Sequence, residues 1–222
     1  MAMEINHFFE FSSKLVSTTF HARAVGLKRK DDKDSLGDAL RLLIGNHESV
    51  SFPVTFKQFS GKNLYDVLDT GWAGLYLISD HMQSVLEENK LSGWETFPIR
   101  LLEKNGAEIK GYQGFSITGR CGPIDISKSE VIQKRLVPNG PLSKFYKGYH
   151  IGLNEWDGRD FFLPKHYYGT MITAGAAKVI ESNGMTNIRL TNLADIEISE
   201  GTAELIRSKQ NGYVGQRRAF DS

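Results

Sequence analysis

The clearest periodic signal in the chain begins near residue 74. Leu75 to Ile78 form a short apolar run that predicts a β-strand, and Ser79 follows it as a helix N-cap. The apolar residues that come next recur at the i, i+3, i+4 spacing of one helical face, and they are Met82, Val85 and Leu86. A strand followed directly by an amphipathic helix is therefore predicted here.

A β-hairpin is predicted directly after this helix. Extended patterns indicate one strand from Trp94 to Leu102 and a second from Glu108 to Thr118. Asn105-Gly106 lies between them, and both residues tolerate the positive φ of a type I′ turn. Pro98 removes one ladder hydrogen bond, so it predicts an edge or a bulge at that position.

A second strand–helix–strand segment repeats the first at a constant offset of 94 residues. Ser79 corresponds to Thr173, and the helix faces, the asparagines near the helix ends and the following strands correspond as well. Each unit exposes an apolar face that it cannot bury alone. We therefore predict two duplicated units, at about 74–102 and 169–195, that share one core.

Weaker patterns predict the remaining elements. Residues 5–25 are apolar and β-branched, which favours a strand. Apolar positions between residues 36 and 44 predict a helix that begins at Ser35 as N-cap and ends at Gly45. Further short elements are predicted as two helices and one strand, near residues 64–68, 127–136 and 145–153 respectively.

These elements together predict an α+β fold in three regions. Residues 1–49 form an N-terminal segment packed on the main domain, and residues 50–200 form the duplicated α+β domain. Residues 201–222 form a C-terminal helix or tail, which becomes polar and contains glycine beyond Asn211.

Composition excludes several classes of protein. The formal net charge is +1, from 27 basic and 26 acidic residues, so the basic surplus of a general nucleic-acid binder is missing. No apolar run approaches the roughly 20 residues of a membrane span. Met1 to Phe11 lack the pattern of a secretory signal, and the single cysteine, Cys121, excludes an intrachain disulfide. We expect a cytoplasmic protein without a membrane partner.

The sequence contains few candidate catalytic or metal-ligating residues. The densest group of possible metal ligands is His150, Asp157, Asp160 and His166, but it spans a predicted loop and is more typical of surface polar residues. Arg120 beside Cys121 would lower the thiol pKa and raise its reactivity, yet no base is tied to this cysteine. No phosphate loop or catalytic motif is present in the sequence. We therefore predict no catalytic residues, no metal site and no cofactor.

The polar segment 154–160 is the candidate partner-binding site. Trp156 lies there among charged residues, which are Glu155, Asp157, Arg159 and Asp160. A tryptophan in such a loop is either a lid over the core or an exposed recognition anchor. Both interpretations remain open at the level of sequence.

The segment around residues 77–116 resembles a bacterial family of predicted immunity proteins of polymorphic-toxin systems. The resemblance is carried by LISD at 77–80, by VLEENKLSGW at 85–94, by FPI at 97–99 and by GYQGFS at 111–116. Residues 172–193 look like the second such unit of that family, and the likeness covers roughly residues 50–198. The resemblance implies a non-enzymatic protein whose partner is a cognate toxin, and it brings no catalytic residues.

The favoured functional hypothesis is thus an immunity protein that neutralises a toxin by direct protein–protein binding. One alternative is an enzyme of unknown class that uses Cys121 or the region from His150 to His166. The other alternative is a regulatory or structural interaction module without a toxin partner.

Overall fold

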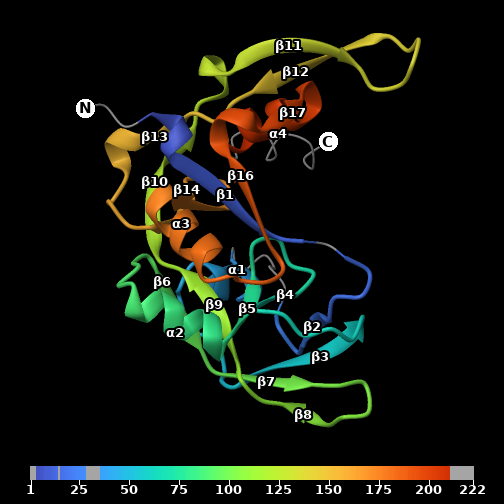
Figure 1. Ribbon diagram of the computed structural model, residues 1–222, viewed down its shortest axis with the longest axis vertical. Helices are drawn as coiled ribbons and strands as arrows, with labels where there is room; N and C mark the ends of the chain where they lie inside the picture. The colour runs from blue at the N-terminus through green and yellow to red at the C-terminus, as the bar shows by residue number, and fades with distance from the viewer. Residues whose placement is uncertain (1–3, 15, 29–35, 211–222) are drawn as a thin grey trace, which may run out of the picture.

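A computed structural model describes residues 4–14, 16–28 and 36–210 of the chain. It has a mixed α+β fold (Figure 1), as the sequence predicts. The predicted N-cap Ser35 and the predicted tail beyond Asn211 lie outside the described residues. The α-helices are α1 (Asp38–Leu43), α2 (Asp80–Glu88), α3 (Ala174–Ser182) and α4 (Glu200–Gln210).

The described strands form four sheets, and the strands of each sheet are given below in their spatial order. The six-stranded sheet contains β13 (Ile151–Gly152), β10 (Gly119–Ile124), β14 (Phe161–Pro164), β15 (Thr170–Thr173), β1 (Phe8–Ser13) and β16 (Ile188–Asn192). The first four-stranded sheet contains β4 (Val67–Asp69), β5 (Tyr76–Ser79), β9 (Tyr112–Ile117) and β6 (Trp94–Phe97). The second contains β2 (His21–Val25), β3 (Val54–Ser60), β7 (Ile99–Leu102) and β8 (Glu108–Ile109). The three-stranded sheet contains β11 (Glu130–Arg135), β12 (Leu142–Lys147) and β17 (Glu197–Ser199).

These sheets are spread along an elongated molecule. In Figure 1 the hairpin of β11 and β12 lies at one end, and the sheet that contains β7 and β8 lies at the other. The six-stranded sheet and the first four-stranded sheet lie between them, with α2 and α3 beside them. The two ends of the molecule therefore present separate surfaces.

The two predicted repeat segments contain the same elements at the same positions. Strand β5 and helix α2 occupy residues 76–88, and β15 and α3 occupy residues 170–182, at the offset of 94 throughout. Ser79 Oγ accepts a hydrogen bond from Met82 N, and Thr173 Oγ1 accepts one from Ala176 N. Both hydroxyls thus cap their helices in the same way. A common origin of the two units stays a prediction.

The likeness between the two units extends to a third strand in each of them. In the first unit β9 lies between β5 and β6, and in the second unit β1 lies between β15 and β16. Ser79 pairs with Tyr112 in the first unit, as Thr173 pairs with Phe8 in the second. The second unit therefore takes its central strand from the N-terminal segment, which is part of the sheet and is not merely packed on it.

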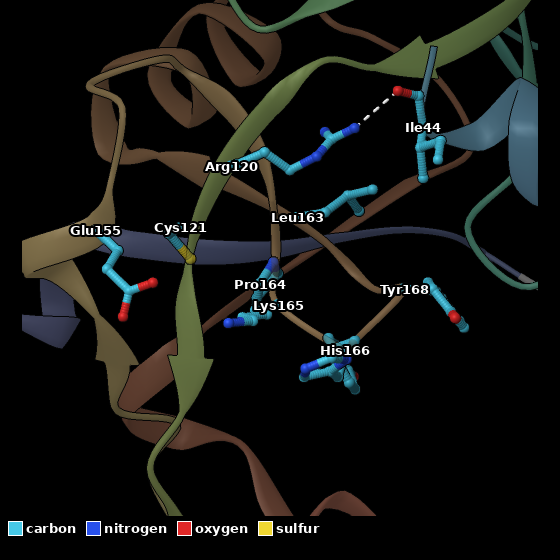
Figure 2. Close-up of a pocket in the computed structure, with 10 residues that line it drawn as sticks. Ile44, Arg120, Cys121, Glu155, Leu163, Pro164, Lys165, His166 and Tyr168 are labelled. Carbon is cyan, nitrogen blue, oxygen red and sulfur yellow. Dashed lines mark hydrogen bonds between the residues drawn. The ribbon is translucent and has the colours of Figure 1, made fainter. Parts of the chain in front are cut away.

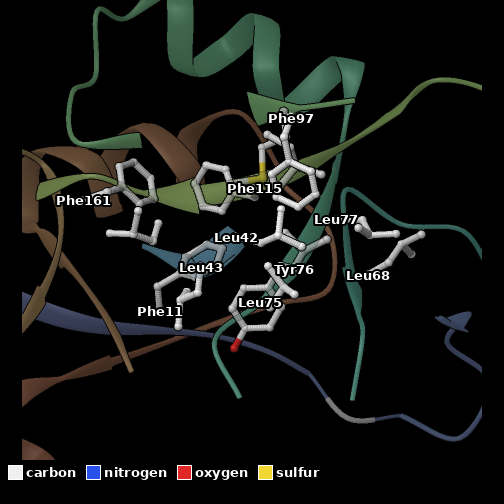
Figure 3. Close-up of a cluster of buried hydrophobic side chains, with 14 of the residues drawn as sticks. Phe11, Leu42, Leu43, Leu68, Leu75, Tyr76, Leu77, Phe97, Phe115 and Phe161 are labelled. Atoms are coloured by element: carbon white, nitrogen blue, oxygen red, sulfur yellow. The ribbon is translucent and has the colours of Figure 1, made fainter. Parts of the chain in front are cut away.

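The two units share one large hydrophobic core. Figure 3 shows Tyr76 and Leu77 of β5, Phe115 of β9, Phe11 of β1 and Phe161 of β14 in this cluster. Burial of such aromatic side chains dominates the stabilisation of a core. A smaller second cluster lies on the other face of the six-stranded sheet, where β12, β17 and α4 pack.

The predicted hairpin differs from the observed one in its turn and in its continuity. Strands β7 and β8 pair through Leu101 and Ile109, and residues 103–107 connect them in place of a two-residue turn. Gly106 has a φ of 92° and its N–H bonds to Glu103 O at 3.0 Å. Each predicted strand is split, one at Pro98 and the other at Gly111, so the hairpin joins two sheets.

Two of the predicted short helices are wrong. The segment near 64–68 contains strand β4, and Val67 pairs with Ile78 of β5. The segment 127–136 contains a short 3₁₀ turn, Ile126–Lys128, followed by β11. In both places tertiary pairing to a neighbouring strand decides the structure over a weak local pattern. Helix α1 is present, but it begins at Asp38 after Gly37.

Two further predicted strands are each divided into two. The segment 145–153 contains the end of β12 and the short β13, and residues 5–25 contain β1 and β2. Gly148 lies between β12 and β13 with a φ of 87°. A glycine in this conformation lets the chain turn from one sheet into another.

Candidate interaction surfaces

Trp156 covers the second hydrophobic cluster. Its ring makes an edge-to-face contact with Phe8 at a centroid distance of 5.3 Å and lies 5.9 Å from the ring of Phe162. Its Nε1–H donates a hydrogen bond to Arg159 O at 3.1 Å. The indole thus has both an apolar environment and a partner for its polar atom, which is the arrangement of a lid over the core.

Most of the charged neighbours of Trp156 make hydrogen bonds within the protein. Asp157 accepts hydrogen bonds from the N–H groups of Arg120 and Arg159, at 2.9 and 3.2 Å. Arg159 donates through Nη1 to Thr118 Oγ1 at 3.0 Å. Glu155 ends a 3₁₀ turn and its side chain is exposed. The candidate partner-binding residues therefore lie together, but most of their polar atoms already bond within the protein.

Asp160 joins the two repeat units. One carboxylate oxygen accepts hydrogen bonds from N and Oγ of Ser92, each at 2.9 Å, and the other accepts from Thr173 Oγ1 at 2.9 Å. Thr173 N–H also bonds to Asp160 O at 3.0 Å. Asp160 thus connects the helix cap of its own unit to the chain that follows the helix of the other unit.

Asp66 makes the corresponding contacts from the first unit to the second. Its carboxylate accepts from Ser79 Oγ at 2.7 Å and from N and Oγ1 of Thr186 at 2.8 and 2.6 Å. Asp66 and Asp160 lie 94 residues apart, as Ser92 and Thr186 do. The two aspartates therefore fasten the units to each other reciprocally, and no sequence motif indicated this.

Burial and hydrogen bonding act in opposite directions on Asp66. Burial raises the pKa of this carboxyl group, but hydrogen bonds from Thr186 and Ser79, together with one from His81, hold the pKa below its ordinary value of 3.8. The ionised form is therefore the one that the fold favours.

The environment of Cys121 contradicts the expectation that Arg120 lowers its pKa. Burial raises the pKa of the thiol to about 12, and Asp157 and Glu155 add to this effect. Arg120 instead donates to three backbone oxygens, and Figure 2 shows the bond to Ile44 O. A thiol with a raised pKa is a poor nucleophile at neutral pH.

A cavity of about 370 Å³ lies beside Cys121 (Figure 2). Lys165, His166 and Tyr168 line it from the segment after β14. A second cavity, of about 520 Å³, is lined by His150 together with Lys128 and Glu4. His150 and His166 thus border different cavities, and neither cavity brings together the four residues weighed as metal ligands.

Within residues 4–14, 16–28 and 36–210, no group of three or more His, Cys, Asp or Glu side chains could hold a metal ion. No helix in this part of the chain is long and apolar enough to cross a membrane.

Among the residues that the structure describes, four exposed aliphatic side chains lie on the hairpin of β11 and β12. We call residues 130–147 the β11–β12 arm. Its most exposed apolar residues are Val131 at 55%, Leu136 at 68%, Val137 at 59% and Leu142 at 57%. Arg135 and Leu142 pair across the hairpin, and the turn 136–141 follows directly, so three of these four side chains gather at the tip.

Strand β17 pairs with the base of the arm, and side-chain contacts from the C-terminal elements reach Lys134, one residue before the end of β11. Lys134 pairs with Glu197 of β17, and Lys144 Nζ lies 3.1 Å from Glu200 Oε1 of α4. Arg207 of α4 lies over the ring of Tyr146, 4.9 Å from its centroid. The turn 136–141 lies beyond these contacts, and among the described residues β11 is an edge strand of its sheet. Sequence reasoning missed this surface because it assigned residues 127–136 to a helix.

Comparison with known proteins adds no assignment. No model of a known protein family matches the chain, and no curated protein matches it.

Proposed function

We propose that this protein is an immunity protein that neutralises a cognate toxin by direct binding, with the β11–β12 arm as its contact surface. The observation that carries the proposal is the cluster of exposed aliphatic side chains at the tip of the arm. Contiguous exposed apolar side chains that are rimmed by polar ones are typical of protein–protein contact sites. The resemblance of residues 77–116 to predicted immunity proteins supports a toxin as the partner.

The geometry of the arm favours this role over one for the loop 154–160. Trp156 and its neighbours use their apolar and polar groups inside the protein, whereas Leu136, Val137 and Leu142 are more than half exposed. Binding energy concentrates where apolar side chains become desolvated on contact. The free edge of β11 also offers backbone N–H and C=O groups to a partner strand.

The proposal is tested by co-expressing this protein with the toxin that it is proposed to bind, which is sought in the adjacent reading frame. We expect survival of the cells and a recoverable complex with the wild-type chain. The triple variant Leu136→Asp, Val137→Asp, Leu142→Asp should lose protection and weaken the complex by about 2 kcal/mol or more.

The matched control is Leu64→Asp, which alters an exposed aliphatic side chain away from the arm. This variant should protect as the wild type does, and all variants should show unchanged thermal unfolding. Undiminished toxicity with the wild-type chain, without a recoverable complex, would contradict the proposed function. Full protection by the triple variant would contradict the role of the arm alone.

A further inference from the structure

The sheet of β2, β3, β7 and β8 has one face buried in the core and one exposed face. Its inner face contributes Ala22, Phe56 and Leu101 to the large core, each at most 1% exposed. On the opposite face Val25 is 55% exposed and Phe59 is 50% exposed. In Figure 1 this sheet lies at the end of the molecule that is remote from the β11–β12 arm.

The outer face is positively charged. Strand register places Arg23 opposite Lys57, Val25 opposite Thr55, and Thr55 opposite Arg100, so these side chains form one continuous patch. We call it the basic sheet face; it consists of Arg23, Val25, Thr55, Lys57, Phe59 and Arg100. The carboxylate beside this patch is Glu108, which lies 2.5 Å from Lys110 Nζ and 4.0 Å from Arg100 Nε.

Two of these cations oppose each other directly. Like charges at facing positions of an antiparallel pair destabilise it. Among the residues that the structure describes, no carboxylate lies within ion-pair distance of Arg23 or Lys57. The Arg23 guanidinium lies 3.3 Å from the centroid of the Phe59 ring, which orients it over the sheet. The folded chain thus places two cations at facing positions on an exposed surface.

We propose that the basic sheet face is a docking surface for an acidic segment of a partner protein. Carboxylates of such a segment would lie over Arg23 and Lys57 and would neutralise their charges. Val25 and Phe59 would cover apolar side chains of the same segment. Complementary charge of this kind accelerates association and selects the partner.

Charge and shape favour an acidic protein segment over a nucleic acid. Single-stranded nucleic acids bind where several exposed aromatic rings stack on successive bases. On this face Phe59 already carries the Arg23 guanidinium on its ring, and Val25 and Thr55 at the other end of the face are not aromatic. The basic sheet face is remote from the arm, so its role does not depend on the toxin-binding proposal.

The test uses the full-length protein and a short fluorescently labelled peptide of glutamate and leucine. Fluorescence anisotropy at low salt should detect binding, and the double variant Arg23→Glu, Lys57→Glu should weaken it at least about tenfold. The control variant Lys165→Glu, Lys178→Glu carries the same charge change on exposed residues elsewhere. It should bind the peptide within about twofold of the wild type.

The single variant Lys57→Glu gives a second readout. It replaces the two facing cations by a pair of opposite charges, so it should raise the melting temperature by about 1–3 °C while it weakens peptide binding. If the face had only a structural role, Lys57→Glu would change the melting temperature without weakening peptide binding.

Three results would overturn the proposal. One is equal binding of the peptide by the double variant and the control variant. Another is tighter binding of a mixed-sequence oligonucleotide than of the peptide, abolished by the same double variant. The third is self-association of the wild-type chain that the double variant removes, because the occupant would then be a second copy.

Discussion

At the scale of the residue, the structure decides between roles that the sequence leaves open. In the sequence Trp156 fits either a lid over the core or a recognition anchor, and in the structure it packs on Phe8 and Phe162. Asp160 was a candidate contact residue, and it holds Ser92 and Thr173. Sequence shows that such residues are polar or aromatic in a loop, but only the fold shows where their atoms point.

Replacing Trp156 by alanine should lower the free energy of unfolding by about 3 kcal/mol. This value is at the low end for aromatic residues, because the indole is only partly buried. Trp156→Phe keeps most of the ring contact and should cost less than half as much. Chemical denaturation followed by circular dichroism measures both. A stable Trp156→Ala variant would contradict the assignment as a core lid.

Replacing Asp66 by alanine should lower the free energy of unfolding by about 2–3 kcal/mol at pH 7, because it leaves Thr186 and Ser79 without their acceptor. The loss depends on pH. The pKa of Asp66 lies below 3.8 in the folded state, so its stabilisation is complete above the unfolded pKa. It disappears as the pH falls through the lower folded pKa.

Urea denaturation of wild type and Asp66→Ala between about pH 2 and pH 7 checks this dependence. The difference between the two chains should be largest near neutral pH and should shrink in acid. Glu88→Ala serves as the control for loss of an exposed carboxylate. A gap that grows toward acid pH would show that the ionised Asp66 is not the stabilising form.

At the scale of the element, the turns that follow α2 and α3 contain residues with positive φ. Lys90 and Gly184 both have positive φ, at 54° and 62°, and Gly93 and Asn187 follow with 89° and 61°. The carbonyls of Gly93 and Asn187 accept hydrogen bonds from Thr118 N and Lys14 N. These turns therefore place the central strand of each unit against its neighbours.

Gly93 and Gly106 provide a matched pair of substitutions. Both have a φ near 90° (89° and 92°), but a Cβ at Gly93 would lie 2.0 Å from Phe161 O, whereas nothing lies within 4 Å at Gly106. Gly106→Ala should cost about 1 kcal/mol from backbone strain alone. Gly93→Ala should cost clearly more, because the backbone of β14 must move. Thermal unfolding of both variants checks this order, and equal losses would contradict the close approach.

At the scale of the whole molecule, the chain is joined by contacts between its most distant parts. Strand β1 pairs with β15 and with β16, and Asp66 binds Thr186. The N-terminal segment is thereby as essential to the second unit as β9 is to the first. A molecule built in this way should not tolerate loss of its first strand.

Deletion of residues 1–14 should abolish cooperative folding, because it removes the strand between β15 and β16 and the core residues Phe8 and Phe11. The control replaces the tip of the β11–β12 arm, residues 136–141, by Asn-Gly. This variant should keep the wild-type melting temperature, since the tip residues are largely exposed. Far-UV circular dichroism and thermal unfolding distinguish the two. A truncated chain that melts like the wild type would contradict the role of β1.

The sequence by itself determined the elements whose local and tertiary preferences agree. Residues 76–88 and 170–182 contain a hydroxyl cap, an apolar helix face and a preceding apolar strand, so their structure follows from short-range pattern. The α+β class follows from the same segments. Pro98 likewise marked the point at which a long strand is interrupted.

Only the tertiary structure decided the partners of the strands and the direction of side chains. Residues 64–68 and 127–136 fit a short helix as well as a strand, and pairing to β5 and β12 selects the strand. The insertion of β1 between β15 and β16 depends on hydrogen bonds over more than 150 residues, for which no local pattern exists. The physical reason is that backbone pairing and charge alignment on a sheet face are long-range properties, whereas caps and helix faces are set within a few residues.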